Sequence, residues 1–226
     1  MSEAFPQGLW LLFFALVSWL LGTIPSAAIA VKVSGKGDIT TLGSGNSGAT
    51  NALRVVGLKA AVAVLIFDFL KGFFPPLASQ SAARVLGFEI PLGYVGAASG
   101  LLAMVGHLFS PWIGFRGGKG VATGAGAFAA LLPETLIPCL VVFICALAIS
   151  RRASVASLAA ALAIPVRVFV FGLSGGRSEG LALYAFACAG PALVVWAHRG
   201  NIKRLIAGTE RALFNYGKGG DDEKLR

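Results

Sequence analysis

Charged side chains are scarce in this chain. Only 13% of its 226 residues are Asp, Glu, Lys or Arg, whereas 56% are hydrophobic. A soluble domain carries about twice that charged fraction, so the composition excludes a soluble globular protein and predicts an integral membrane protein. Leu9–Val31 is an apolar run of span length with no basic segment before it. It therefore does not have the pattern of a cleaved signal peptide.

Cysteine, histidine and acidic residues are also few. The cysteines Cys139, Cys145 and Cys188 lie in apolar runs without metal-ligand spacing, which is typical of buried small hydrophobic residues and not of disulfides or metal sites. Most acidic residues lie near the C-terminus or in connections that the topology below places outside the cell, which leaves few ligands for a metal. We therefore expect no metal and no cofactor. His-x4-Asp and HExxH are absent, and no Gly-x-Ser-x-Gly stands in the context of a catalytic triad, which excludes the chemistries that these motifs carry.

The apolar runs predict an all-α membrane protein with seven transmembrane helices. The run from Lys119 to Ser150 is too long for one span, because its helix would reach about 48 Å across a hydrocarbon core of about 30 Å. Pro133-Glu134-Thr135 interrupts it, so two short spans joined by a tight turn fit better. The other expected spans are Leu9–Val31, Val55–Ala78, Gly93–Phe109, Val155–Leu173 and Leu181–Trp196.

The distribution of Lys and Arg predicts the orientation. With seven spans, residues 32–54, 110–119, 151–152 and the segment after residue 198 share one side and hold most basic residues, whereas the other side holds only Arg84 and Arg177. Such asymmetry places the N-terminus outside and the C-terminus in the cytoplasm. The basic residues flank spans instead of forming an aromatic-laced patch, so the net charge of +9 does not indicate nucleic acid. We expect residues 1–216 to form one membrane domain and the Gly/Lys/Asp-rich residues 217–226 to be a disordered cytoplasmic tail.

The stretch from Gly43 to Arg54 is a glycine-rich loop that opens into a helix. Its glycines allow positive φ and close approach to a ligand, and the helix start offers free N–H groups to an anion. Thr50 and Asn51 share a helix face with Arg54. The stretch is either a plain connector or a phosphate site. The residues that would form the phosphate site are Ser44, Gly45, Asn46, Gly48, Ala49, Thr50, Asn51 and Arg54.

Further polar segments favour the phosphate site. Gly117-Gly118-Lys119-Gly120 starts a span, but Ile113 and Gly120 break the Walker A spacing, so nucleotide binding is not expected. His198 and Asn201 follow the last span and point together if the helix continues, and Ser154 and Ser157 form a patch after Arg151-Arg152. His107 and Trp112 are interpreted as interface anchors, and Asp68 and Lys71, near the outer half of the second span, as an ion pair or an interfacial snorkel.

Three motifs together resemble the bacterial acyl-phosphate-dependent glycerol-3-phosphate acyltransferase family (PlsY). They are Ser44-Gly45-Asn46-x-Gly48-Ala49-Thr50-Asn51-x-x-Arg54; Gly106-His107-x-x-Ser110-Pro111 running on to Gly117-Gly118-Lys119-Gly120-Val121-Ala122-Thr123; and His198-x-x-Asn201-Ile202-x-Arg204-Leu205-x-x-Gly208-x-Glu210. The resemblance implies transfer of a fatty acyl group from acyl phosphate to the sn-1 hydroxyl of glycerol 3-phosphate, giving lysophosphatidic acid and phosphate without a metal. It also implies that the protein lies in the bacterial cytoplasmic (inner) membrane, in contact with membrane lipid, with its active site on the cytoplasmic face.

The resemblance also implies roles for single residues. Ser44 and the loop from residue 45 to residue 50 would hold the acyl phosphate. Arg54, Lys119, His198 and Asn201 would hold glycerol 3-phosphate, with Gly117, Gly118, Ser154 and Ser157 lining the site. The general base would be His198 or a substrate phosphate oxygen, and the phosphate oxygen is favoured. An organic-phosphate transporter or exchanger is the alternative function, although the polar segments gather at one interface instead of the midplane.

Overall fold

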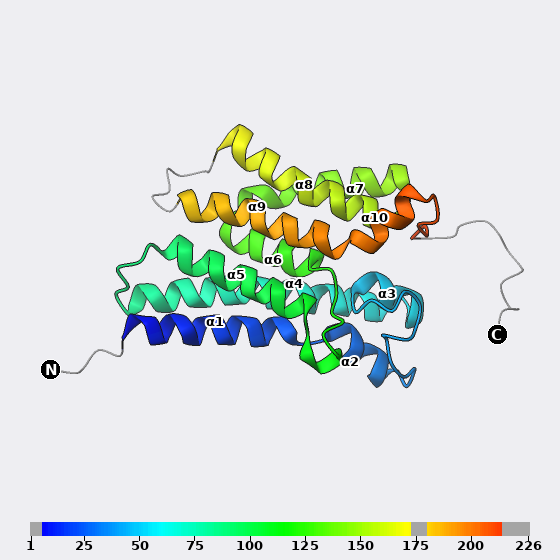
Figure 1. The fold of residues 1–226 in the computed structure, drawn as a ribbon, viewed down its shortest axis with the longest axis horizontal. Coiled ribbons are helices and arrows are strands. Elements are labelled where there is room, and N and C mark those ends of the chain that lie inside the picture. The colour runs from blue at the N-terminus through cyan, green and yellow to red at the C-terminus, as the bar shows by residue number, and fades with distance from the viewer. Residues whose placement is uncertain (1–5, 173–179, 214–226) are drawn as a thin grey trace, which may run out of the picture.

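The computed structural model describes residues 6–172 and 180–213, and within these residues every regular element is a helix. The helices run along the long axis of the molecule in Figure 1. In chain order they are α1 (Gln7–Thr23), α2 (Ser26–Val33), α3 (Ala49–Val55), α4 (Leu58–Val85), α5 (Leu92–Leu108), α6 (Val121–Leu131), α7 (Leu136–Ser150), α8 (Ala153–Phe171), α9 (Gly180–Ala197) and α10 (Arg199–Ile206), with single 3-10 turns at Pro111–Ile113 and Pro133–Thr135.

Six segments of the described chain are long and apolar enough to cross a membrane, with α1 and α2 counted together as Gln7–Val33. The prediction of an all-helical integral membrane protein is therefore confirmed. The remaining apolar helix, α6, has 11 residues. At 1.5 Å per residue it is about 16 Å long, which is roughly half of a hydrocarbon core.

The predicted break between residues 119 and 150 is confirmed, because α6 ends at Leu131 and α7 begins at Leu136. Two other spans differ from the prediction in detail. The run Leu9–Val31 is not one straight span: α1 ends at Thr23, and Pro25 precedes the separate helix α2. The second span does not run from Val55 to Ala78, because α3 and α4 are separated at Gly57 (φ 104°) and α4 continues to Val85 through two prolines. Prolines are tolerated in membrane helices where neighbouring helices cover the freed backbone groups.

Small residues let the helices approach closely. A Cβ atom on Gly72 of α4 would overlap with the carbonyl oxygen of Thr123 in α6, and one on Gly126 of α6 would overlap with the carbonyl oxygen of Phe69 in α4. Gly22 and Gly106 make the same kind of contact between α1 and α5. In lipid, where apolar burial alone does not hold helices together, such backbone contact supplies much of the packing attraction.

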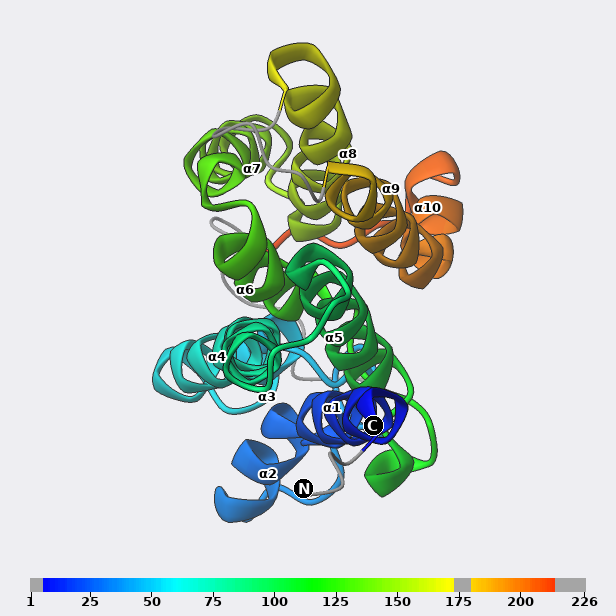
Figure 2. The same cartoon turned by 90° about the vertical axis from the view of Figure 1, so that its left-hand side faces the viewer.

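Figure 2 views the bundle from one end and shows α6 between the α4–α5 pair and the α7–α8 pair. The small helices α2, α3 and α10 gather at the end of the bundle where α1 and α9 finish (Figure 1). We call this the loop end. The connection of residues 109–120 lies there too, whereas residues 86–91 and 132–135 connect helices at the opposite end.

Candidate active site

One cavity of about 1090 Å³ lies at the loop end and receives residues from α3, α4, α6, α8, α10 and the connections between them. Of the site residues predicted from the sequence, only Gly45 does not line it. The residues that line it are Ser44, Asn46, Gly48, Ala49, Thr50, Asn51, Arg54, Gly117, Gly118, Lys119, Ser154, Ser157, His198 and Asn201. Segments more than a hundred residues apart in the chain thus meet around one space.

Asn51 shapes the first glycine loop (residues 43–48) from within. Its Oδ1 accepts a hydrogen bond from the Ser44 N–H at 2.8 Å, and its Nδ2 donates to the Leu42 carbonyl at 2.9 Å. The side chain is 1% exposed, and a Cβ on Gly43 would overlap with its Oδ1. The amide of Asn51 is therefore engaged in holding the loop. Gly45, with φ 69° and its N–H on the Leu42 carbonyl, turns the same loop without facing the cavity.

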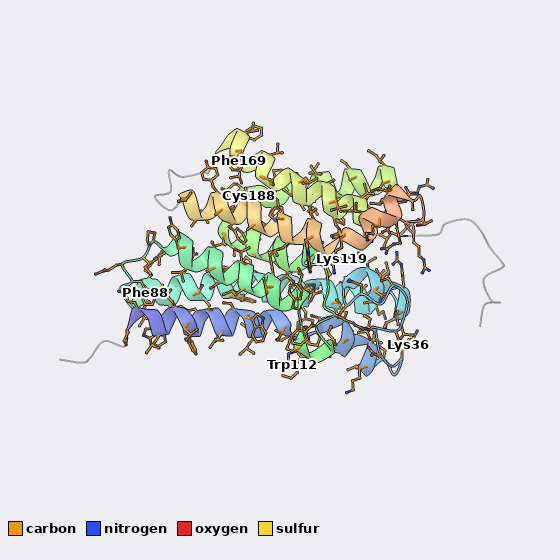
Figure 3. The ribbon with its side chains drawn as sticks, viewed as in Figure 1. Lys36, Phe88, Trp112, Lys119, Phe169 and Cys188 are labelled. Carbon is orange, nitrogen blue, oxygen red and sulfur yellow. The ribbon has the colours of Figure 1, made fainter. Side chains whose placement is uncertain are left out.

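The second glycine loop (residues 117–120) folds back onto the end of α5. The N–H groups of Gly117 and Gly118 each donate at 3.1 Å, to the carbonyls of Leu108 and His107. Asn46 Nδ2 donates to the Gly117 carbonyl at 3.4 Å, which joins the two loops. Lys119 follows directly and lies inside the bundle near its loop end, whereas Lys36 lies at the outer edge (Figure 3).

The segment after α10 returns over the cavity and brings a carboxylate to it. Glu210 Oε1 accepts hydrogen bonds from Ser154 Oγ at 2.7 Å and Asn201 Nδ2 at 2.6 Å, and Oε2 accepts from Arg204 Nε at 2.7 Å. Arg54 also reaches this segment, donating to the Ala212 carbonyl at 3.5 Å. Glu210 thus joins two of the predicted site residues that come from different helices.

The charges around the cavity alter one another's pKa values. Burial lowers the pKa of Lys119 to about 8; Glu210 opposes this change, and Arg204 and Arg54 add to it. Burial also lowers the pKa of the Arg54 guanidinium, which nevertheless stays charged. Burial raises the pKa of Glu210, but the hydrogen bonds from Ser154, Asn201 and Arg204 outweigh this and lower it. Near pH 7 the described cavity therefore has an excess of positive charge.

His198 is the neutral member of this group. Burial lowers its pKa to about 4, and the nearby charge of Lys119 contributes. Its Nδ1 lies 2.8 Å from the Val194 carbonyl, so Nδ1 carries the proton and Nε2 is left as a hydrogen-bond acceptor. At neutral pH this side chain accepts a hydrogen bond from a ligand instead of offering a positive charge.

Comparison with known proteins identifies the family. The profile of the glycerol-3-phosphate acyltransferase family matches residues 12–208. A glycerol-3-phosphate acyltransferase of Endomicrobium trichonymphae is 40% identical over 202 residues, covering 89% of this chain and 95% of its own length. The chain belongs to the glycerol-3-phosphate acyltransferase family.

Further relatives support the same family assignment. The glycerol-3-phosphate acyltransferase of Rhizobium meliloti (strain 1021) is 38% identical over 200 residues, covering 88% of this chain and 90% of its own. Two crystal structures of PlsY, an integral membrane glycerol 3-phosphate acyltransferase, are 33% identical and cover 89% of this chain and 94% of theirs. The glycerol 3-phosphate form has a TM-score of 0.78 and the lysophosphatidic acid form one of 0.75.

The cavity of this acyltransferase also has an apolar part. Beyond the polar residues it extends along α4, α6, α7 and α8, where its lining includes Leu65, Phe128, Leu136, Cys139, Leu140, Phe143 and Ile164. α6 packs mainly on α4 and only slightly on α7, and no residue of α7 is fully buried. A space lined by polar residues at one end and by apolar residues at the other suits an amphiphilic ligand.

Three cavity residues have roles that the sequence reasoning did not predict. Glu210 was recognised only as part of the third motif. It could have been found in the sequence as the one acidic residue in the basic segment from Arg199 to Arg211, which turns back at Gly208 (φ 70°). His107 is 6% exposed and lines the cavity, so its interpretation as an interface anchor is wrong. Asp68 and Lys71 do form an ion pair, at 2.8 Å, but its placement in the outer half of the span is wrong, because Lys71 Nζ donates to the Ile24 carbonyl at the α1–α2 junction. A carboxylate inside a span is itself a signal of function.

Proposed function

We propose that this protein transfers a fatty acyl group from acyl phosphate to the sn-1 hydroxyl of glycerol 3-phosphate, giving lysophosphatidic acid and inorganic phosphate. The observation that carries the proposal is the single cavity in which the three motifs meet, cationic at the loop end and apolar along α6–α8. The PlsY structures, in their glycerol 3-phosphate and lysophosphatidic acid forms, support it.

Two phosphorylated substrates repel each other, and the cations at the loop end offset this repulsion. Arg54 offers a planar guanidinium fork that fits phosphate oxygens, and Lys119 offers a mobile point charge. Ser44 and the first glycine loop hold the acyl phosphate, and Arg54, Lys119, His198 and Asn201 hold glycerol 3-phosphate. Ser154 and Ser157, which are 4% and 8% exposed, line the site on α8. The Asn51 amide contributes by holding the loop in shape.

The chemistry needs no covalent enzyme intermediate, because acyl phosphate is a mixed anhydride and is already activated. The sn-1 hydroxyl oxygen attacks the acyl carbon, the bond from that carbon to the phosphate oxygen breaks, and phosphate leaves. The hydroxyl proton passes to a phosphate oxygen, whose pKa of about 6 suits this role. His198, neutral and with Nε2 free to accept, orients the glycerol backbone as a binder. The enzyme contributes position and charge stabilisation.

The acyl chain lies in the apolar part of the cavity, between α6 and the α7–α8 pair. Acyl phosphate can enter from the lipid on the α7 side of the cavity, because α7 covers this space only loosely. No metal or other cofactor takes part in this scheme.

The basic loop end faces the cytoplasm in this proposal, in the inner membrane of a bacterium. α6 counts as a seventh, shortened span, which leaves the N-terminus outside and the C-terminal tail inside. Residues 1–216 act as one membrane domain. The tail from residue 217 lies outside the described residues.

The decisive experiment mixes the purified protein with acyl phosphate and glycerol 3-phosphate and measures released phosphate and lysophosphatidic acid. Arg54→Ala and Lys119→Ala should each lower kcat/KM by about a hundredfold or more, the effect of removing a charged group that binds phosphate. His198→Ala should raise KM and leave kcat near normal, as expected of a binding residue. Movement of glycerol 3-phosphate across vesicles without phosphate release would establish the transporter instead.

A further inference from the structure

Four buried polar side chains lie at the side of the cavity where the α1–α2 junction, α4 and α5 meet, and two of them, Asp68 and His107, line it. We call them the support cluster: Ser26, Asp68, Lys71 and His107. Asp68 is 2% exposed, and its Oδ1 accepts from Ser26 Oγ at 2.6 Å and from Lys71 Nζ at 2.8 Å. Charges within a span are costly, and they are commonly associated with function. The reaction proposed above uses none of these four side chains.

His107 connects the support cluster to the second glycine loop. Its Nδ1 lies 3.6 Å from Asp68 Oδ1, so the carboxylate faces the ring at the wall of the cavity. On the other side of the ring, Gly118 packs so closely that a Cβ there would overlap with His107 Nε2. The carbonyl of His107 also accepts the Gly118 N–H at 3.1 Å.

Gly118 also lies close to the first glycine loop. A Cβ on Gly118 would come within 2.8 Å of the Ser47 carbonyl oxygen, so Gly118 is held between His107 and that loop. Lys119 is the next residue along the chain. The position of its ammonium group therefore depends on this backbone, and a displacement of about 1 Å in a site can lower the rate about a hundredfold.

We propose that Asp68 and His107 are positioning residues: Asp68 fixes the imidazole of His107, and the imidazole fixes the Gly117–Gly118 turn that presents Lys119 to phosphate. Lys71 neutralises Asp68 and ties it to the carbonyl of Ile24 at 2.7 Å, which anchors the support at the end of α1. This inference rests on the proposed function in one respect, namely that Lys119 binds a substrate phosphate.

The test variant removes both charges of the pair at once. Asp68→Asn combined with Lys71→Met keeps the approximate shape of both side chains. It also leaves no unpaired buried charge, which would be strongly destabilising. Ser99→Ala is the matched control, because Ser99 Oγ donates to Ser79 Oγ at 2.8 Å and joins the same helices, α4 and α5, without lining the cavity.

Two quantities are measured on purified protein in lipid. The first is KM for glycerol 3-phosphate. The second is the pH at half-maximal labelling of Lys119 by an amine reagent, read by mass spectrometry, which needs no catalysis. For the unmodified protein this midpoint should lie at the Lys119 pKa of about 8.

In the double variant KM should rise about tenfold. The labelling midpoint should move up by about one unit, toward the ordinary lysine value near 10.4, as Lys119 leaves its buried place. Ser99→Ala should change neither quantity. The inference fails if the double variant leaves both quantities unchanged, or if Ser99→Ala changes them equally.

A milder variant tests the inference if the double variant does not fold. Ser26→Ala removes only the hydroxyl that donates to Asp68, and it should raise KM about twofold, the effect of losing part of one hydrogen bond. An unchanged KM would then overturn the inference. Normal activity of Lys119→Ala would instead overturn the proposed function. The labelling midpoints of the unmodified protein and the double variant would still report on the positioning of Lys119.

Discussion

At the scale of single residues, the charge of Lys119 should set the alkaline limit of activity. Its pKa of about 8 means that the free enzyme loses this cation as pH rises through that value, while it is fully charged below. Because kcat/KM reports on the free enzyme, it should fall about tenfold per unit above pH 8. Lys119→Arg, which stays charged, should be less active overall but keep its kcat/KM constant up to about pH 10. Rates for glycerol 3-phosphate from pH 6 to 10 decide this, and an equal alkaline fall in both proteins would contradict it.

Glu210 should matter through the residues that it holds. Glu210→Gln leaves Arg204 without its carboxylate partner and replaces a charged acceptor for Ser154 and Asn201 with a neutral one. We expect kcat/KM to fall by about tenfold, since hydrogen bonds to charged groups contribute about 1.5–3 kcal/mol. Glu89→Gln, an exposed change at the opposite end of the bundle, is the control and should have no effect. A variant as active as this control would show that Glu210 does not shape the site.

At the scale of elements, the glycines between α4 and α6 should be indispensable. Gly126→Ala would push its Cβ into the carbonyl of Phe69 and separate the two helices. Overpacking of this kind costs about 1–3 kcal/mol, and α6 carries the second glycine loop at its start, so both stability and activity should fall. Gly8→Ala is the control, because a Cβ at Gly8 in α1 meets nothing within 4 Å. Thermal unfolding in detergent compares the two, and equal midpoints would contradict the close contact.

The elements also show what a single sequence can and cannot predict. The break at Pro133 was predictable because proline and span length agree. The break at Pro25 was missed because hydropathy continues across it, and the separation of α3 from α4 depends on a positive φ at Gly57 that composition does not reveal. The cavity residues on the motifs could be named, but the return of Glu210 and the contact of His107 with Gly118 are tertiary and leave no periodic pattern in the chain.

At the scale of the whole molecule, the proposed topology places the loop end in the cytoplasm. Lys36 and Glu89 are both exposed, and α4 lies between them in the chain, so a spanning α4 puts them on opposite sides of the membrane. We expect Glu89→Cys, in a protein whose Cys139, Cys145 and Cys188 are replaced by Ala, to react in intact cells with a thiol reagent that cannot cross the membrane. Lys36→Cys should react only after the cells are permeabilised.

The four outcomes of this labelling separate the two parts of the topology. The reverse pattern would keep α4 as a span but turn the active site outward, where acyl phosphate from the cytoplasm could not reach it. Labelling of both residues, or of neither, in intact cells would mean that α4 does not separate them. The excess of basic residues at the loop end favours the cytoplasmic placement, because Lys and Arg are retained on that side during insertion. On the proposed function, the charges that bind phosphate are thus the ones that would also orient the protein.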